Sequence, residues 1–382
     1  MNGLKITHIS SDAARLPENI REQIENAKKI TVIQAENPDG DSIGSALALE
    51  EIFANMGKKV SLHCPVQVPT YLRYISGWDR IFTDFDYDAD LAVIVDTSSK
   101  LLLSKTLRNP AARNFLEKTP VLVLDHHVQV TPDLPFDAEY IISNTAVSTG
   151  EMIFDLFREQ SGNFTEKPIN SAAAEDIYIS IQADSLGLTT ESTTAESFIA
   201  TGELVKLGAN PSKIEEKRRE LMKKKPEILE YKGRLIERIE YFNSGRTALI
   251  KIPFDEIQKY SNDYNPTMLV LDEMRLVVGV DVAIGVKMYP DGKITGKLRT
   301  NIPVSHFIAK NFGGDGHAYA AGFRIYENYD DFLREFTATM EKIYAEYDDE
   351  NSRTFGSEMA RENYENVVKN NDENIGSFRI KK

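Results

Sequence analysis

The sequence has one cysteine, Cys64, among 382 residues, and it has no apolar run long enough to cross a membrane. A single cysteine excludes an intrachain disulfide framework and fits a reducing compartment. The N-terminal residues MNGLKITHISSDAAR contain neither the apolar core of a secretory signal nor a lipidation motif. We therefore expect a soluble, cytoplasmic protein that does not bind membranes.

Positive charge is also scarce. Lysine and arginine number 45 against 59 aspartates and glutamates, which gives a formal net charge of -14. Binding to long nucleic acid depends on releasing counterions from many phosphates, so this balance argues against such a partner. A small phosphorylated substrate, held by metal ions and a few basic residues, is compatible with it.

Two common catalytic loops are missing as well. No GxSxG nucleophile elbow and no Walker A loop occurs in the chain. The sequence therefore gives no indication of a serine nucleophile or of a P-loop.

The first half of the chain alternates apolar runs with segments of helical periodicity. Strands are predicted at 30–33, 60–64, 91–96 and 121–125, and helices at 20–29, 42–56, 146–160 and 171–183. Such alternation predicts a largely parallel sheet with helices on both faces, and ligands of such sheets bind beyond the carboxyl ends of the strands.

The second half predicts a separate unit. Residues 212–240 are rich in Lys, Arg and Glu and indicate a solvated connecting helix, interrupted near Pro226. Strands are predicted beyond it at 247–252, 277–288, 293–299 and 322–326, with a helix at 305–311 and a hairpin turn at 290–292. From about Asp348 the chain is polar and acidic, which predicts a mobile tail or a lone peripheral helix.

Aspartates follow the predicted strands. Asp39 and Asp41 lie in a Pro/Gly turn after the first of them, and Asp96 ends the apolar run 91–95. Each has a structural alternative, because turns are rich in aspartate and Asp96 could cap a helix. A carboxylate at the end of a buried strand is nevertheless costly unless it is paired or bound to a cation.

Asp125-His126-His127 is the more specific motif, because packing does not explain one carboxylate and two imidazoles at a strand end. Asp184 adds another acidic residue at an element boundary. Together these side chains could hold two divalent cations about 3.5–4 Å apart, which would clamp a phosphate and activate a water. Hydrolysis of a phosphate ester is therefore the predicted reaction. His63 beside Cys64 could form a two-ligand metal fragment, but a buried strand end is the plainer interpretation.

The second unit contributes Gly313-Gly314-Asp315-Gly316-His317 and Arg299. Glycines allow backbone N–H groups to approach an anion closely, and Arg299 and His317 can add charged or hydrogen-bonding contacts. The glycines alone would be an ordinary turn in most proteins.

Read in order, these motifs resemble those of the DHH/DHHA1 phosphoesterases, over about residues 20–340. The compact layout is most similar to the branch of nanoRNases, pAp phosphatases and cyclic-dinucleotide phosphodiesterases within the RecJ-like superfamily. The segments that carry the resemblance are Asn37–Ser45, Val95–Thr97, Asp125–His127, Ala183–Ser185, and Phe312–His317 with Ala320–Phe323.

The resemblance implies an α/β fold of two domains. The larger N-terminal DHH domain would hold a mostly parallel sheet flanked by helices, and the smaller C-terminal DHHA1 domain a mixed sheet. The expected boundaries are 1–205 for the catalytic domain, 206–228 for a helical linker, 229–345 for the substrate-binding domain and 346–382 for the tail. A homodimer is an expectation from the family alone.

The resemblance also implies roles for single residues. Asp39 would bind the first cation and Asp41 the second, and Asp96 would bridge them. His126 and Asp184 would complete the second site, with His127 close to the phosphate and Ser148-Thr149-Gly150 beginning a helix near the site. The ions would usually be Mn²⁺, with Mg²⁺, Co²⁺ or Fe²⁺ also suited to these ligands. The substrate would be gripped by Arg299, Gly313, Gly314, Gly316 and His317.

The chain departs from the family pattern at two positions. Ala35 occupies the place of the usual metal-binding histidine, so the first site should be weaker or rearranged. Glu36 should point the other way if the strand is still extended there. Asp315 stands where many members have glycine, which could alter phosphate preference.

Three functions follow from these observations. The first is hydrolysis of short oligoribonucleotides, linear dinucleotides or 3'-phosphoadenosine 5'-phosphate (pAp). The second is hydrolysis of cyclic di-AMP or of polyphosphate, with the same metals. The third, prompted by Ala35, is a degenerate protein that binds nucleotides without turnover.

Overall fold

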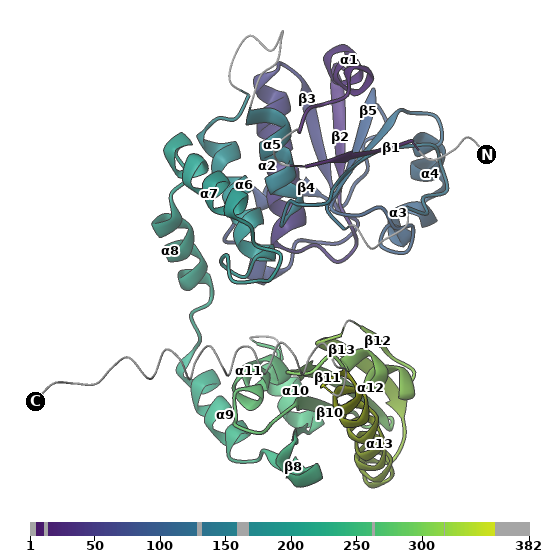
Figure 1. Ribbon diagram of the computed structural model, residues 1–382, viewed down its shortest axis with the longest axis vertical. Helices are drawn as coiled ribbons and strands as arrows, with labels where there is room; N and C mark the ends of the chain where they lie inside the picture. The colour runs from purple at the N-terminus through teal and green to yellow at the C-terminus, as the bar shows by residue number, and fades with distance from the viewer. Residues whose placement is uncertain are drawn as a thin grey trace, which may run out of the picture. The chain divides into compact units, whose positions relative to one another are not determined.

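The computed structural model describes residues 5–10, 14–127, 132–158, 168–261, 264–316 and 318–355. The chain forms two compact units, Met1–Lys223 and Lys224–Lys382. The boundary falls inside the predicted linker 206–228. Each unit is built around its own sheet (Figure 1).

The first unit contains a seven-stranded sheet in which every paired strand is parallel. The strands lie in the order β1 (Lys5–Ile9), β7 (Glu139–Ser143), β6 (Val121–Asp125), β5 (Leu91–Val95), β2 (Lys29–Ile33), β3 (Lys59–His63) and β4 (Ile81–Phe82). The chain runs outward from β2 to β3 and β4, then returns to the other side of β2 at β5. The reversal between β2 and β5 is the position where open parallel sheets bind ligands.

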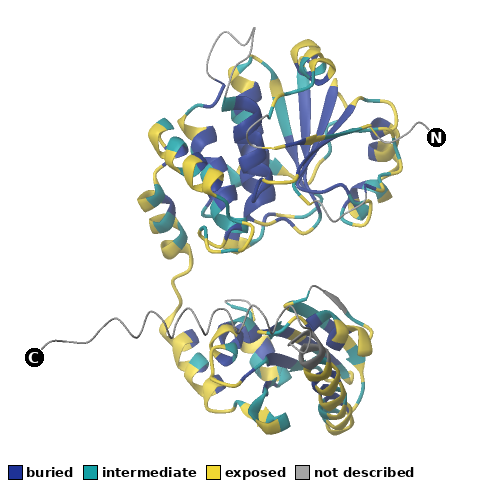
Figure 2. Ribbon diagram, in the orientation of Figure 1, coloured by how far each residue is buried: buried dark blue, intermediate teal, exposed yellow. Residues whose placement is uncertain are grey.

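Helices cover both faces of this sheet, as the sequence predicted. One face packs against a layer that includes α2 (Gly40–Asn55) and α6 (Ser171–Asp184), with apolar side chains such as Ile43 and Ile177 fully buried. The layer is completed by α1 (Glu18–Asn26), α5 (Thr149–Arg158) and α7 (Ala195–Leu207). The other face packs against α4 (Pro110–Leu116), which follows α3 (Ser104–Arg108). Figure 2 shows α2 as an almost entirely buried helix.

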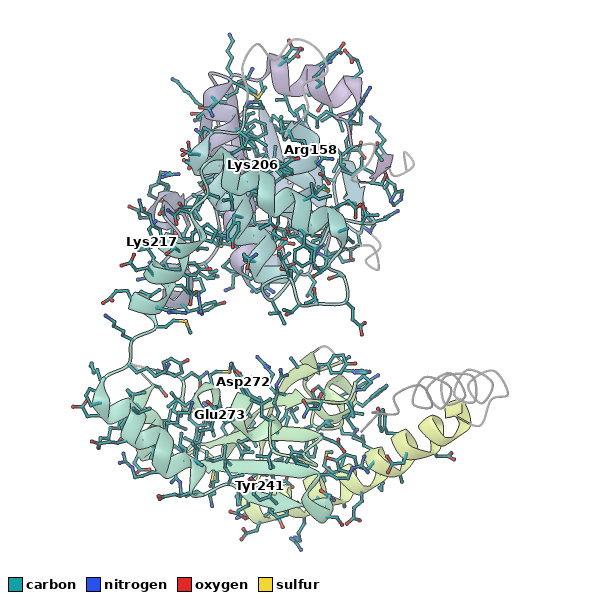
Figure 3. All side chains as sticks on the ribbon, turned by 60° about the vertical axis from the view of Figure 1, so that its left-hand side comes forward. Arg158, Lys206, Lys217, Tyr241, Asp272 and Glu273 are labelled. Carbon is teal, nitrogen blue, oxygen red and sulfur yellow. The ribbon has the colours of Figure 1, made fainter. Side chains whose placement is uncertain are left out.

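The predicted connecting helix is two helices, α8 (Pro211–Leu221) and α9 (Pro226–Ile236). Pro226 begins the second helix rather than kinking a single one, because proline suits a first helical turn. On α8, Lys217, which is labelled in Figure 3, donates hydrogen bonds to Ser76 and Glu175 of the first unit. This anchors α8 to the first unit, so the break comes after it.

The second unit has a mixed six-stranded sheet. Its order is β12 (Asp315–Gly316), β13 (Ala320–Tyr326), β11 (Lys293–Thr300), β10 (Val282–Met288), β9 (Thr247–Ile252) and β8 (Glu240–Phe242), and only β9 and β10 are parallel neighbours. One face packs against α12 (Ser305–Asn311) and α13 (Tyr329–Phe355). On the other face, α9, α10 (Phe254–Tyr260) and α11 (Leu271–Arg275) cover β9 and β10.

One predicted strand boundary is wrong. The strand predicted at 277–288 begins only at Val282, because the chain turns at Gly279, where φ is 85°. At the start of the segment predicted as a mobile tail or a lone peripheral helix, α13 continues through Phe355, and Asp348 pairs with Arg246. Residues 356–382 and the end of the helix predicted at 146–160 lie outside the described residues.

The predicted α/β class, with a parallel and a mixed sheet, is confirmed. Strands β1 and β7 were not predicted from the sequence. None of the helices in the described ranges is both long enough and apolar enough to span a membrane.

Candidate metal centre

Four of the predicted ligands converge at the reversal between β2 and β5. Asp41 lies in the first turn of α2, Asp96 directly follows β5, and His126 directly follows β6. Asp184 ends α6, which packs against α2. Parallel strands end at the same edge of a sheet, so three of these positions meet because of the topology alone.

His126 Nε2 is the centre of the cluster. It lies 3.0 Å from Asp184 Oδ2 and 3.6 Å from both Asp41 Oδ2 and Asp96 Oδ1. None of these approaches has the alignment of a hydrogen bond, so this nitrogen is buried without a hydrogen-bond partner among the described residues. A nitrogen surrounded by carboxylate oxygens in this way is suited to share a cation with them.

The carboxylate of Asp41 is fully buried and held by four donors. The backbone N–H groups of Thr149 and Gly150 donate at 2.9 and 3.2 Å, and the hydroxyls of Ser45 and Ser180 donate at 2.9 and 2.5 Å. Thr149 and Gly150 begin α5, so Asp41 also faces the positive end of that helix. These contacts fix the direction in which the carboxylate can bind a cation.

Ser148 lies directly before α5. Its hydroxyl accepts from the N–H of Glu151, as an N-cap does. The next two residues hold Asp41, so the helix start is also part of the site.

Glycines allow α2 and α6 to approach closely enough to join Asp41 and Asp184. A Cβ at Gly40 would lie 2.5 Å from the Cβ of Ala183, and one at Gly44 would lie 2.6 Å from the carbonyl oxygen of Asp176. No larger residue fits at either position without moving a helix. Gly40 and Gly44, which belong to the first motif, therefore set the spacing of the site.

Removing the Ser180 hydroxyl is expected to weaken metal binding. Ser180→Ala deletes the shortest hydrogen bond to Asp41, and loss of a group that orients a ligand costs on the order of 10–100-fold in metal affinity. The metal affinity is measured by titration with Mn²⁺, with enzyme activity and the rise in melting temperature as the two signals. Thr201→Ala is the control, because that hydroxyl bonds only a carbonyl of α7. Equal metal affinity in all three proteins would contradict the orienting role.

The charges of the site are unbalanced without a cation. Desolvation favours a lower pKa for His126, but its interactions with Asp184 and Asp41 outweigh this and raise the pKa to about 9. Burial, together with the charges of Asp41 and Asp39, raises the pKa of Asp96 well above its usual range. Divalent cations bound by these side chains would compete with their protons.

Asp96 adopts a backbone conformation that non-glycine residues rarely use, with φ at 61°. Its N–H bonds the carbonyl of Leu124 at 2.9 Å, and its Oδ1 accepts from the Thr149 hydroxyl at 3.3 Å. The strained backbone turns the carboxylate from the end of β5 toward His126.

His127 is held differently from His126. Its Nδ1 lies 2.8 Å from Oδ1 of the buried Asp125, and its side chain is 48% exposed. Burial alone would raise the pKa of Asp125, but its hydrogen bond and charge interaction with His127 hold it below the usual range. Asp125 thus directs the Nε2 atom of His127 away from itself.

Asp39 stands apart from the cluster. Its carboxylate accepts from the N–H of Ser42 and caps α2, and it belongs to neither of the two groups whose ligand atoms lie within 4.8 Å of one another. Those groups are Asp96 with His126 and His127, and Asp41 with His126 and Asp184. Although the residue is exposed overall, desolvation of its carboxylate and the charges of Asp41 and Asp184 raise the pKa of Asp39 to about 6. Its role as a ligand stays a prediction.

Ala35 has a polar neighbour on each side, Gln34 and Glu36. Glu36 points elsewhere, because its carboxylate accepts from the Ser104 hydroxyl and the Lys105 N–H at the start of α3. Gln34, which sequence reasoning passed over, is fully buried, and neither atom of its amide has a partner among the described residues. An unsatisfied buried amide costs about 1–3 kcal/mol, so a further polar group is expected beside it. No sequence pattern signals this.

His63 and Cys64 are core residues. His63 Nδ1 and Nε2 lie 3.2 Å from the Asp84 carbonyl and the Thr106 hydroxyl, and Cys64 is fully buried. Neither residue belongs to a potential metal group among the described residues.

The predicted substrate residues lie in the second unit. Arg299 is on β11, and Gly313 and Gly314 line a cavity of about 670 Å³ beside that strand. Gly316 is in β12, whereas His317 lies outside the described residues.

The donor set fits a divalent cation. Carboxylates and imidazoles together suit Mn²⁺, Fe²⁺, Co²⁺ or Zn²⁺, and Mg²⁺ suits the carboxylates. The unpartnered Nε2 of His126 is the observation that supports this fit, because a protein does not usually bury such a nitrogen without a ligand.

Comparison with known proteins finds a family match and several similar chains. Residues 29–181 match the family described as "DHH family, N-terminal domain". The bifunctional oligoribonuclease and PAP phosphatase NrnA of Bacillus subtilis is 22% identical over 289 residues, which cover 76% of this chain and 87% of that protein. Uncharacterized protein MG371 of Mycoplasma genitalium is 26% identical over 318 residues, covering 81% and 90%. The crystal structure of an exopolyphosphatase-related protein from Bacteroides fragilis shares the fold, with a TM-score of 0.72 at 23% identity over 85% of this chain and 95% of that one.

Proposed function

We propose that this chain, a hydrolase of phosphate esters whose residues 29–181 match the DHH family, cleaves short oligoribonucleotides, linear dinucleotides or pAp. We further propose Mn²⁺ as its cation and the cytoplasm as its location. The observation that carries the proposal is the convergence of Asp41, Asp96 and Asp184 on the Nε2 atom of His126. The similarity to NrnA supports this choice of substrates.

The chemistry divides between the ions and the protein. Divalent cations, when bound, polarise the phosphate and lower the pKa of the attacking water. Asp41, Asp96, His126 and Asp184 would hold them, and His126 is the residue that the two potential metal groups share. Buried donors fix Asp41, so little reorganisation is needed during the reaction.

His127 is suited to contact the phosphate. Its Nδ1 is engaged by Asp125 and its side chain is about half exposed, so Nε2 is the ring atom left for a phosphate. From there it could donate a hydrogen bond to a phosphate oxygen or pass a proton to the leaving oxygen.

We assign the first cation to Asp39, with Asp96 shared. This half of the site has one fewer imidazole than the family pattern, because Ala35 offers only a methyl group. In the second unit, Arg299, Gly313, Gly314, Gly316 and His317 are proposed to grip the nucleotide.

Two alternatives use the same observations. Hydrolysis of cyclic di-AMP or polyphosphate needs the same metals and differs in the substrate pocket; the shared fold of the exopolyphosphatase-related protein does not decide between them. In a protein that binds nucleotides without turnover, the carboxylates and the imidazole clustered around His126 would have no catalytic role.

A substrate panel separates these functions. Wild-type protein with Mn²⁺ is offered pAp, RNA of two to five nucleotides, cyclic di-AMP and polyphosphate, and we expect turnover of pAp and the short RNAs. Faster turnover of cyclic di-AMP or polyphosphate would select the second function. Binding of nucleotides with no hydrolysis beyond that of Asp96→Asn would leave only the binding protein.

Restoring the missing imidazole tests the first site. Ala35→His should lower the Mn²⁺ concentration that gives half-maximal rate, because it adds a nitrogen ligand beside Asp39. Ala35→Leu is the control for size at this buried position, where the wild-type residue is 5% exposed. An unchanged requirement in Ala35→His would mean that another ligand already fills the position, for which Gln34 is the candidate.

A further inference from the structure

One face of the second sheet carries cations that the metal centre does not use. Alternate residues of a strand share a face, so Thr295 and Lys297 of β11 point the same way. The strand register places Lys287 of β10 and Arg324 of β13 on either side of Thr295, on that same face. We call the surface formed by Lys287, Lys297 and Arg324 the cationic trough.

The floor of the trough is made of small residues. Gly285 and Gly322 are the register partners of Lys297, one on each side. A Cβ at Gly285 would lie 2.6 Å from Cγ2 of Thr267, so this glycine lets Thr267 pack on the sheet and line the cavity, whereas Gly322 lines the cavity itself. The trough lines the cavity of about 670 Å³, and Gly313 and Gly314 form part of its wall. A Cβ at Gly314 would lie 2.2 Å from the carbonyl oxygen of Gly322, so this loop must be glycine to pack against β13.

The three cations lack acidic partners. Among the described residues, no carboxylate lies within 4 Å of the charged groups of Lys287, Lys297 or Arg324. Other cations of this unit are paired, as in Lys232–Glu273, Arg238–Glu256 and Arg246–Asp281. Desolvation, together with neighbouring positive charge, lowers the pKa of both Lys287 and Lys297. A chain with a net charge of -14 thus gathers unpaired positive charge in one hollow.

Tyrosines lie at one end of the trough. Tyr289 lines the cavity, and the Nζ of Lys293 sits 3.9 Å from the centre of its ring. Tyr326 is paired with Lys293 in the register and is 68% exposed. Exposed rings beside a row of cations are what single-stranded nucleic acids use for base stacking and phosphate contacts.

We propose that the cationic trough binds the phosphates of a single-stranded oligonucleotide, and so favours substrates longer than two residues. This rests on the proposed function and adds Lys287, Lys297 and Arg324 to the contacts expected of Arg299 and the glycine loop. Lys287 and Arg324 flank Thr295 across two strand spacings of about 5 Å each, and Lys297 lies about 7 Å further along β11, spacings that the phosphates of an extended chain can follow. The tyrosines favour a nucleotide chain over bare polyphosphate.

The test measures binding, so that it does not depend on turnover. In an Asp96→Asn background, anisotropy of labelled RNA gives the affinity for two- and five-nucleotide chains. We expect Lys287→Gln/Lys297→Gln to reduce the affinity advantage of the longer chain at least about fivefold. The slope of log affinity against log salt for the longer chain should fall by about 1.4, since each lost single-strand phosphate contact removes about 0.7. Lys310→Gln/Lys342→Gln, which removes two exposed charges from α12 and α13, is the control for net charge.

Two results would overturn the proposal. One is a trough variant that still binds five-nucleotide RNA more tightly than two-nucleotide RNA by the wild-type factor, or a control variant in which this factor falls equally. The other is binding of inorganic polyphosphate as tight as that of RNA of equal charge, with no effect of Tyr326→Ala on either ligand, which would make polyphosphate the occupant. Failure of the substrate panel with a preserved length advantage would count against the hydrolytic assignment and not against the trough.

Discussion

Asp96→Asn is expected to lower hydrolysis on the order of 10³-fold or more and to raise the melting temperature of the metal-free protein. The substitution keeps the size of the side chain, and asparagine tolerates positive φ as aspartate does, so the backbone at 61° is preserved. It removes one charge from a buried group of carboxylates that includes Asp41. Activity and stability should therefore move in opposite directions.

The stability gain follows from burial. An ionised carboxylate with like charges nearby is unfavourable in the folded state unless a cation is bound. A gain of about 1 kcal/mol would raise the melting temperature by about 2–4 °C in a unit of this size. With Mn²⁺ added, the wild type should have the higher melting temperature, because it gains a free energy of metal binding that the variant has lost. Thermal unfolding in chelator and in Mn²⁺, with turnover of pAp, measures both effects.

Asp176→Asn is the matched control. Asp176 lies on α6, is 4% exposed, and burial and neighbouring acids raise its pKa well above the usual range. It is absent from both potential metal groups. The control should stabilise the protein with or without metal and leave turnover unchanged. If Asp176→Asn lost activity as Asp96→Asn does, or if Asp96→Asn kept wild-type turnover, the metal-centre assignment would be wrong.

Gly150→Ala should damage both folding and catalysis. The added Cβ would lie 2.0 Å from the Ser180 hydroxyl oxygen and 2.5 Å from the Ser180 Cβ, so α5 and α6 must separate. Overpacking of this kind costs about 1–3 kcal/mol of unfolding free energy. The same movement withdraws the N–H groups of Thr149 and Gly150 from Asp41. Metal affinity should therefore fall in the fraction that remains folded.

Denaturant unfolding and Mn²⁺ titration at low temperature separate the two effects. Gly202→Ala on α7 is the control, because its Cβ would meet nothing within 4 Å and alanine is the better helix former by about 1 kcal/mol. The double variant Gly150→Ala/Ser180→Gly removes the clash, so it should be less destabilised than the sum of its single variants. Additive losses would show that the close approach at Gly150 does not set the position of α5.

The sequence predicted those strands that are continuous apolar runs followed by a polar motif. Strands β2, β5 and β6 are buried on both faces and read as unbroken apolar runs, and the period of α2 is clear. Strands β1 and β7 escaped prediction. The residues of β1 alternate in character, and the strand lies at the edge of the sheet, paired with a strand more than 130 positions away. Local pattern carries no information on such a partner.

The site was predictable in its residues but not in its grouping. The motif spacing marked Asp39 and Asp41 as equals, yet the side chain of Asp39 caps α2 whereas that of Asp41 turns inward to the start of α5. Gln34 carried no signal at all.

The sequence by itself determined the chemistry: which carboxylates and imidazoles exist, that they follow strands, and that a methyl group stands at Ala35. These are local facts, because strand ends and motif residues are set by neighbouring positions. Only the tertiary structure decided which side chains share a cation site. Asp184 lies beside His126 because glycines of α2 allow α6 to pack closely against that helix. The tertiary structure also decided that Lys287, Lys297 and Arg324 lie on one open face, because strand register, unlike composition, is a property of the folded sheet.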